Sequence, residues 1–182
     1  MSLEKINVNR SDAELLGILF SYVPKIAEAK QLDSLLVLIA DLGRELVLAE
    51  RCSLWLVSSD KKELWTKVAH GCDEIRIPIT AGFVGYSYAN NEPFLIEDAY
   101  NDSRFDSSVD KNSGYRTKAV LTVPFKNSVG EVMGVFQAIN KVGGTQFSKD
   151  DLKFLQLTAV YSAKSLESAM LFQELERTQE EI

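Results

Sequence analysis

The sequence predicts an α+β domain with a mostly antiparallel central sheet of about six strands, and with N- and C-terminal helices packed on one face. Three observations lead to this prediction. The hydrophobic period is helical at both ends of the 182-residue chain and strand-like in the middle. Short turns join the strands, which favours hairpins and therefore antiparallel pairing. A composition of 46% hydrophobic and 25% charged residues is that of an ordinary globular domain.

Two helices are predicted before the sheet. Residues 12–29 repeat apolar side chains at helical spacing, namely Leu15, Leu19, Tyr22 and Ile26. Ser11 and Asp12 are suitable N-caps, and Pro24 inside the pattern should kink or split this helix. A second helix is expected over residues 33–49.

The middle of the chain predicts strands. The strand-like segments are residues 51–57, 63–69, 75–79, 94–96, 119–125 and 132–140. Residues 58–62 and 127–130 are hairpin turns, and Pro78 indicates a strand end or an edge strand. A short helix is expected over 81–90, and the polar segment 98–114 is expected to be a loop with a short helix.

The last helix, residues 148–180, should dock on the sheet by its first half. Its second half carries a thin seam of Leu171, Leu175, Thr178 and Ile182 among charged residues. Such a seam is buried only with a partner, so we expect a parallel homodimer through the terminal helices, with the first helix packed alongside the last. The alternative is a terminal helix whose exposed half is merely solvated.

Charge and composition exclude several function classes. The formal net charge is −6, which argues against a broad nucleic-acid-binding face. The chain has no apolar run of about 18 residues and no signal-peptide pattern, so we expect a cytoplasmic protein with no membrane partner. Cys52 and Cys72 lack metal-ligand spacing and are predicted to be reduced thiols.

No set of residues predicts catalysis. His70 lies two residues from Cys72 without a third, orienting group. Carboxylates recur every four residues at Asp98, Asp102, Asp106 and Asp110, which one helix face could present to a metal ion. The favoured interpretation is that they are loop, capping and solvated charges. The chain is therefore predicted to be non-catalytic, with no metal site and no required cofactor.

An ordered series of motifs resembles one known family. The matching segments are 51–56, 82–85, 98–105, 109–110, 114–117, 123–124 and 137–141, followed by Phe147 and Asp151. Together they resemble GAF domains, and most closely the cyclic-nucleotide-binding GAF domains of phosphodiesterases and cyanobacterial adenylate cyclases. The resemblance runs over about residues 33–172. It implies residues 1–32 as an N-terminal helix or linker, 33–172 as the GAF domain and 173–182 as the start of a coiled-coil linker.

The family signature includes a structural latch. In this sequence its positions are Asn140, Lys141, Phe147 and Asp151. A bridge from Lys141 to Asp151 would clamp the end of the last strand to the first turn of the last helix. Leu152 stands where the family has Glu, so the signature is incomplete at its last position.

The resemblance also implies a ligand site between the sheet and the polar segment 98–114. Its residues would be Ser53, Phe83, Val84, Asp106, Asp110, Ser113 and Thr117. Ser53 would face a purine base, and Asp110 would bond the base or ribose.

Other positions of this implied site would meet the sugar and the phosphate. The backbone of Phe83 and Val84 would contact the base or sugar, and Ser113 and Thr117 would supply hydroxyls near the cyclic phosphate. Asp106 departs from the family, because an aromatic or amide group is expected at that position.

The implied function is that of a regulatory sensory domain. It would bind a small ligand, cAMP or cGMP by the resemblance, and relay binding through a dimeric helix to an output domain of the phosphodiesterase, cyclase or kinase class. The tail 175–182 is similar to linkers that precede bacterial HD-type phosphodiesterase domains. The alternatives are a ligand-free dimerisation module and a sensor of another small molecule. A covalent bilin is disfavoured because segment 98–114 lacks Cys and His, and haem would have only His70 as a ligand.

Overall fold

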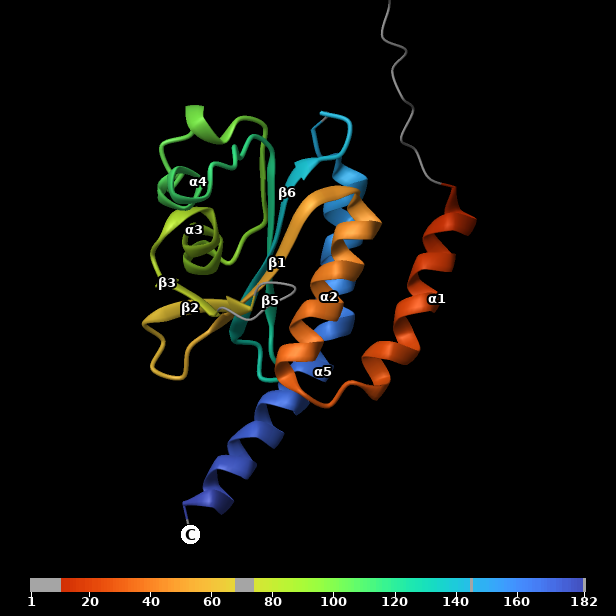
Figure 1. Cartoon of the computed structure of the whole chain (residues 1–182), viewed down its shortest axis with the longest axis vertical. Coiled ribbons are helices and arrows are strands. Elements are labelled where there is room, and N and C mark those ends of the chain that lie inside the picture. Colours follow the sequence, from red (N-terminus) through yellow and green to blue (C-terminus); the bar gives the residue numbers. More distant parts are fainter. Residues whose placement is uncertain (1–10, 68–73, 145, 182) are drawn as a thin grey trace, which may run out of the picture.

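A computed structural model describes residues 11–67, 74–144 and 146–181 (Figure 1). The elements follow in the order α1 (Asp12–Glu28), α2 (Leu32–Val47), β1 (Ala49–Val57), β2 (Glu63–Lys67), β3 (Glu74–Pro78), α3 (Gly82–Asn90), β4 (Phe94–Ile96), the 3-10 helix η1 (Ala99–Asn101), α4 (Ser108–Ser113), β5 (Val120–Lys126), β6 (Val132–Lys141) and α5 (Lys149–Glu180).

The strands form one six-stranded sheet in the order β3-β2-β1-β6-β5-β4. Every pairing in it is antiparallel, so the predicted α+β class and sheet type are confirmed. β3 is an edge strand that ends at Pro78, where the missing N–H interrupts no ladder. β1 and β6 lie at the centre and pair over the longest register, from Ala49–Lys141 to Leu56–Gly134.

One face of the sheet is covered by α2 and α5, as predicted (Figure 1). Between these helices and the sheet lies the main core, whose largest fully buried side chains include Phe136, Leu35, Leu36, Ile39, Leu54, Leu121, Leu155 and Leu166. Gly43 lets α2 approach the sheet closely, because a Cβ at this position would overlap the ring of Phe136.

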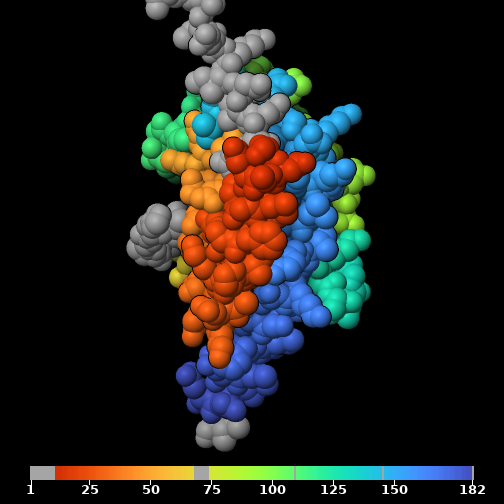
Figure 2. Space-filling view, turned by 90° about the vertical axis from the view of Figure 1, so that its right-hand side faces the viewer, coloured from red at the N-terminus to blue at the C-terminus, as the bar shows by residue number. Residues whose placement is uncertain are grey.

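Helix α1 differs from its expected placement. It packs mainly against α2, because the two helices are joined by a three-residue link and therefore form an antiparallel hairpin. In Figure 2, α1 lies on the surface between α2 and α5. Ser11 caps α1 as predicted, since its hydroxyl accepts from the N–H of Glu14 at 3.2 Å. The helix is not split at Pro24, and Tyr22 and Ile26 on either side of it are both buried.

The boundary between α2 and β1 also differs from the prediction. Leu48 adopts a left-handed conformation with φ of 51°, which ends the helix, and Ala49 already begins β1. Leu and Ala are good helix formers, so local propensity extends the predicted helix to residue 49. The pairing of Ala49 with Lys141 in the sheet overrides that propensity.

Helix α5 has 32 residues and a complete capping box at its start. The hydroxyl of Ser148 accepts from the N–H of Asp151 at 3.1 Å, and the carboxylate of Asp151 accepts from the N–H of Ser148 at 2.8 Å. Ala169 is the last buried residue of α5. The following turns project from the body of the domain (Figure 1).

Candidate functional site

The second face of the sheet carries a lid built from α3, η1 and α4 (Figure 1). Two glycines shape its start. Gly82 has φ of +61°, a conformation that other residues rarely adopt. At Gly85 an added Cβ would lie 2.5 Å from the carbonyl carbon of Thr80, so only glycine lets α3 pass this turn. The glycine pair that resembles a family motif therefore has a steric explanation.

A buried carboxylate ties the lid to the segment that leads into β5. Asp110 on α4 accepts hydrogen bonds from the N–H of Thr117 at 2.7 Å, from the Thr117 hydroxyl at 2.8 Å and from the Tyr100 hydroxyl at 2.8 Å. Asp110 and Thr117 are only 7% and 4% exposed. Burial alone would raise the pKa of Asp110, but the bonds from Thr117 and Tyr100 and the nearby Arg51 outweigh it and hold that pKa below its usual range.

Aromatic side chains pack against one another under the lid. The ring of Phe83 stacks on that of Phe105 at a centroid distance of 5.7 Å, and Tyr100 meets Phe105 edge-on at 4.9 Å. Phe83 belongs to a cluster with Ile96, Ala99 and Val120. Val84, the next residue, points into a separate cluster with Trp55, Leu64 and Val135. The two predicted ligand residues of α3 thus lie in two different apolar clusters.

A row of polar side chains crosses the sheet on this face. Ser53 of β1 is directly opposite Gln137 of β6, which is directly opposite Thr122 of β5. Residues opposite each other in antiparallel strands share a face, and their neighbours Trp55, Val135 and Val120 all belong to the clusters under the lid. The polar row therefore forms part of the floor beneath the lid.

The hydroxyl of Thr122 is fully buried and has no hydrogen-bond partner among the described residues. An unpaired buried hydroxyl costs about 1–3 kcal/mol. In a native protein such a group calls for an explanation, and a bound water or ligand is the usual one.

The remaining predicted ligand residues lie at the exposed ends of α4. Asp106 accepts from the N–H of Ser108 at 3.0 Å, and the hydroxyl of Ser113 accepts from the N–H of Tyr115 at 3.3 Å. In both bonds an exposed side chain accepts from the backbone N–H two residues further along the chain. The structure thus joins Asp110 to Thr117, places Ser53 on the floor, and leaves Asp106 and Ser113 at the edge.

Two cations at this site were missed by the sequence interpretation. The guanidinium of Arg51 stacks on the ring of Tyr115 at 3.6 Å, and that of Arg116 lies 4.4 Å from the ring centre of Tyr100. Arg51 shares a strand face with Ser53, so the two-residue period of β1 could have indicated it. Gln137 was also missed, because its place beside Ser53 depends on the register between strands far apart in sequence.

The predicted latch residues lie where β6 meets α5. The ammonium of Lys141 bonds both carboxylate oxygens of Asp151, at 2.9 and 3.0 Å, and donates to the backbone carbonyl of Val47 at 2.7 Å. The side chains of Lys141 and Asp151 are 12% and 9% exposed. Phe147 is buried beside them. The pair links β6, the end of α2 and the first turn of α5.

Asn140 connects this latch to the lid. Its side-chain oxygen accepts from the N–H groups of Lys118 and Ala119 at 2.7 and 3.1 Å. Its amide group donates to the hydroxyl of Tyr115 and to the carbonyl of Arg116, each at 2.9 Å. Segment 115–119, which includes the Asp110 partner Thr117, is thereby fixed to the residue that precedes Lys141.

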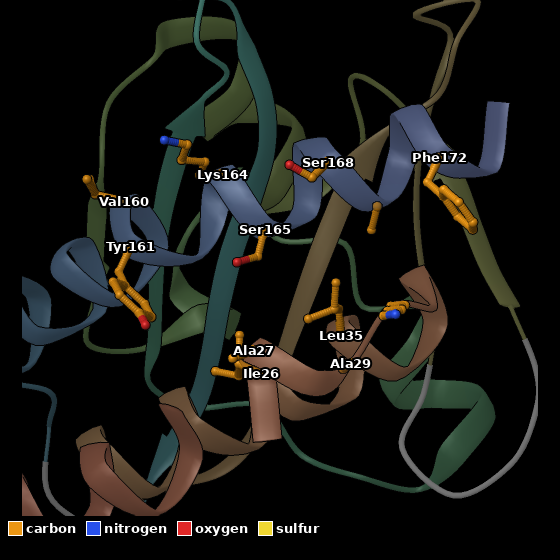
Figure 3. Close-up of a pocket in the computed structure, with 12 residues that line it drawn as sticks. Ile26, Ala27, Ala29, Leu35, Val160, Tyr161, Lys164, Ser165, Ser168 and Phe172 are labelled. Atoms are coloured by element: carbon orange, nitrogen blue, oxygen red, sulfur yellow. The ribbon is translucent and has the colours of Figure 1, made fainter. Parts of the chain in front are cut away.

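A groove lies on the helical side of the domain, away from the lid. It has a volume of about 710 Å³ and is lined by Ile26, Ala27, Ala29, Lys30, Leu35, Val160, Tyr161, Lys164, Ser165, Ser168, Ala169 and Phe172. Figure 3 shows Ser165 pointing from α5 toward Ala27 and Ile26 at the end of α1. The groove results from the packing of α1 on α2, which leaves α1 and α5 apart at this end.

The predicted acidic series forms no metal site. Asp98 accepts from the amide of Asn101 at 2.6 Å, and Asp102 pairs with Arg104 at 2.6 Å. With Asp106 and Asp110 also engaged locally, each carboxylate has its own partner. Within residues 11–67, 74–144 and 146–181, no group of three His, Cys, Asp or Glu residues could hold a metal ion.

Of the two cysteines and the single histidine, the structure describes only Cys52. His70 and Cys72 lie outside the described residues. Cys52 packs against the main core, and burial raises the pKa of its thiol. None of the helices in the described part of the chain combines the length and the apolar character that crossing a membrane requires.

Comparisons with known proteins agree with this fold. A relative from Takifugu rubripes, the dual 3',5'-cyclic-AMP and -GMP phosphodiesterase 11A, is 38% identical over 138 residues, which are 68% of this chain. The chain spans only 15% of that protein's length.

Two solved structures share the fold at 20% identity. The GAF domain of a phosphoenolpyruvate-protein phosphotransferase from Coxiella burnetii has a TM-score of 0.75 and covers 90% of this chain and 99% of its own. The free methionine-R-sulfoxide reductase of Neisseria meningitidis has a TM-score of 0.69 and covers 90% and 95%. The family model described as GAF domain matches residues 31–166, and the chain therefore belongs to the GAF domain family.

Proposed function

We propose that this GAF domain is a regulatory sensory domain that binds a cyclic purine nucleotide, cAMP or cGMP, between the lid and the polar floor. The observation that carries the proposal is the buried junction of Asp110 with Thr117. It closes the lid over a sheet face that holds the polar row of Ser53, Gln137 and Thr122. The similarity to a cyclic-nucleotide phosphodiesterase supports the same ligand class.

Ligand entry would exchange bonds at this junction. In the closed lid, the N–H and hydroxyl of Thr117 are both occupied by Asp110. A cyclic phosphate that accepts from Thr117 would release Asp110, whose carboxylate could then accept from base or ribose donors. Arg51 and Arg116 supply positive charge at the same junction, which offsets the negative charge of the phosphate.

The relay would pass through the latch. Movement of Thr117 shifts segment 115–119. The side chain of Asn140 is bonded to four groups of that segment, and Lys141 holds α5 through Asp151. A ligand shifts such an equilibrium only by its different affinity for the open and closed lid. In the proposal, α5 pairs with α5 of a second copy as a parallel homodimer and carries the change toward an output domain.

The domain itself is proposed to be non-catalytic and cytoplasmic. The reductase that shares the fold demonstrates that some proteins with this fold are enzymes. Sulfoxide reduction by a thiol needs a reactive thiolate, and the half-buried Cys52, with its raised pKa, is unsuited to that role. Any phosphodiesterase, cyclase or kinase activity would belong to a separate output domain.

Calorimetry tests the ligand. Folded protein freed of carried-over nucleotide is titrated with cAMP and with cGMP. We expect one-site binding that Thr117→Val weakens about tenfold or more, because the phosphate loses a hydroxyl donor while the side-chain volume is kept. Thr158→Val is the matched control, since Thr158 is equally buried but its hydroxyl bonds only Phe154 within α5. An absence of heat with both nucleotides would contradict the proposal.

A ligand-free dimerisation module is the second candidate. The observation that favours it is the exposure of Leu171, Phe172 and Leu175, at 57%, 51% and 64%, beyond the last buried turn of α5. Light scattering distinguishes the two functions. A dimer lost in Leu171→Lys/Leu175→Lys, together with no nucleotide binding by the wild type, would leave dimerisation as the function.

A further inference from the structure

We propose that Gln137 selects the purine, and that Trp55 fixes its choice in favour of a base with a carbonyl group at position 6. This inference rests on the proposed function and specifies the ligand of the same site. It begins from the single hydrogen bond that orients Gln137. The indole N–H of Trp55 donates to the side-chain oxygen of Gln137 at 3.3 Å.

The orientation of the Gln137 amide follows from the chemistry of its partner. An indole nitrogen only donates hydrogen bonds, so the amide atom that faces it must be the oxygen. Rotating the amide by half a turn would set donor against donor. The NH₂ group therefore points away from Trp55, and it has no partner among the described residues.

The polar floor consequently presents a fixed donor between two adaptable groups. Ser53 and Thr122 flank Gln137 in register, and their hydroxyls can donate or accept. Only the Gln137 amide has its direction set by a neighbour. Apolar residues border the row on this sheet face, with Trp55 and Val135 on one side and Val120 on the other. Arg51 is the charged neighbour of Ser53 on the same strand face.

A fixed donor distinguishes the two candidate ligands. Guanine carries a carbonyl oxygen at position 6, which can accept from the Gln137 NH₂ group, whereas adenine carries an amino group there. With adenine, two donors would face each other unless the amide rotates and gives up the bond to Trp55. Sites that hydrogen-bond one group reject an analogue that leaves their polar atoms unpaired. We therefore expect cGMP to bind at least about tenfold more tightly than cAMP.

Trp55 acts as a positioning residue for the Gln137 amide. Replacing it by Phe therefore tests whether the orientation of this amide sets the preference between cGMP and cAMP. In Trp55→Phe the amide of Gln137 rotates freely and can turn its oxygen to the adenine amino group. The affinity for cAMP should then rise, so that the ratio of the two affinities falls toward one. A purely structural loss at residue 55 would weaken both nucleotides together. Trp65→Phe on the neighbouring strand is the control, because Trp65 packs against the main core on the opposite face.

The experiment is a calorimetric titration of the wild type and of Trp55→Phe, Trp65→Phe and Gln137→Leu. Each protein is titrated with cGMP, cAMP and cyclic IMP. Cyclic IMP keeps the 6-carbonyl of guanine but lacks its 2-amino group. In the wild type, cyclic IMP should bind like cGMP. Gln137→Leu should lower the affinity for cGMP and cyclic IMP to that for cAMP. This variant tests the same inference if Trp55→Phe does not fold. Equal affinities in the wild type, or a preference for cAMP, would overturn this inference alone. Binding of none of the three would overturn the proposed function with it.

Discussion

The two faces of the sheet differ in how their side chains pack. On the helical face, α2 and α5 bury one continuous apolar core around Phe136, Leu121 and Leu155. On the lid face the apolar residues form two small clusters, with the polar row of Ser53, Gln137 and Thr122 crossing the same face. The helical face therefore supplies most of the apolar burial that stabilises the domain. The lid face has less contiguous apolar packing, and its polar groups can exchange hydrogen-bond partners.

The largest effect is expected at the latch, which links β6, the end of α2 and the first turn of α5. Lys141→Met leaves Asp151 buried and unpaired, and it also removes the bond to Val47. Breaking such a pair costs about 3–5 kcal/mol of the free energy of unfolding. Urea denaturation measures the loss. Lys67→Met, which breaks the partly exposed pair with Asp33, should cost no more than about 1 kcal/mol. Equal losses in both variants would show that the latch is no more than a surface pair.

A slightly smaller effect is expected within the helical core. Leu121 is fully buried on β5, with its side chain on the helical face. Leu121→Ala should lower the free energy of unfolding by about 2–5 kcal/mol, through lost burial and a residual cavity. The midpoint of urea unfolding should move with little change in slope. A cost under about 1 kcal/mol would mean that the two faces are packed alike.

The lid face should respond to acid. The hydrogen bond between Asp102 and Arg104 is the main cause that lowers the pKa of Asp102 to about 2. In an unfolded chain the same carboxyl titrates at about pH 3.9. A depressed folded-state pKa adds stability above the unfolded value, and that stability is lost as the pH falls through about 4 toward 2. The contribution is up to about 2 kcal/mol, less what solvent screens at this partly exposed pair.

Asp102→Asn checks this pH dependence. Its free energy of unfolding should fall less than that of the wild type between pH 5 and about 2.5, and the two proteins should converge in acid. Parallel curves for the two proteins across that range would contradict the role given to the Asp102–Arg104 pair.

The smallest effect is expected one residue from Leu121, on the opposite face. Thr122→Val keeps the shape of the side chain and removes a buried hydroxyl that has no partner among the described residues. Stability should be unchanged or rise by up to about 1 kcal/mol, because no hydrogen bond is lost. Thermal unfolding of the nucleotide-free protein measures this change. A clear loss of stability would mean that Thr122 bonds an internal water.

The order of the elements could be read from the sequence because the hydrophobic period changes where helices give way to strands. The position of Ser11 as a cap follows from local chemistry in the same way. The start of β1 at Ala49 could not be read, because cross-strand pairing overrides helix propensity there. The docking of α1 on α2 also depends on tertiary packing that a single helix pattern does not encode.

The site was accessible to sequence reasoning only in part. Ser53, Asp110 and Thr117 were found through the family resemblance, whereas nothing local indicates that Asp110 and Thr117 bond each other across seven residues. Gln137 enters the floor because β1 and β6, more than 80 residues apart, pair in one register. The role of Trp55 depends on the same register, so it requires the three-dimensional structure.

Hydrogen exchange with and without saturating cGMP reports on the lid, the latch and the helical core in one experiment. If cGMP binds under the lid and acts through the latch, we expect slower exchange in residues 98–119 and at the latch around 140–151, with the amides of α2 unchanged. Slower exchange confined to the groove between α1 and α5, or no change in the lid while cGMP is bound, would contradict this expectation.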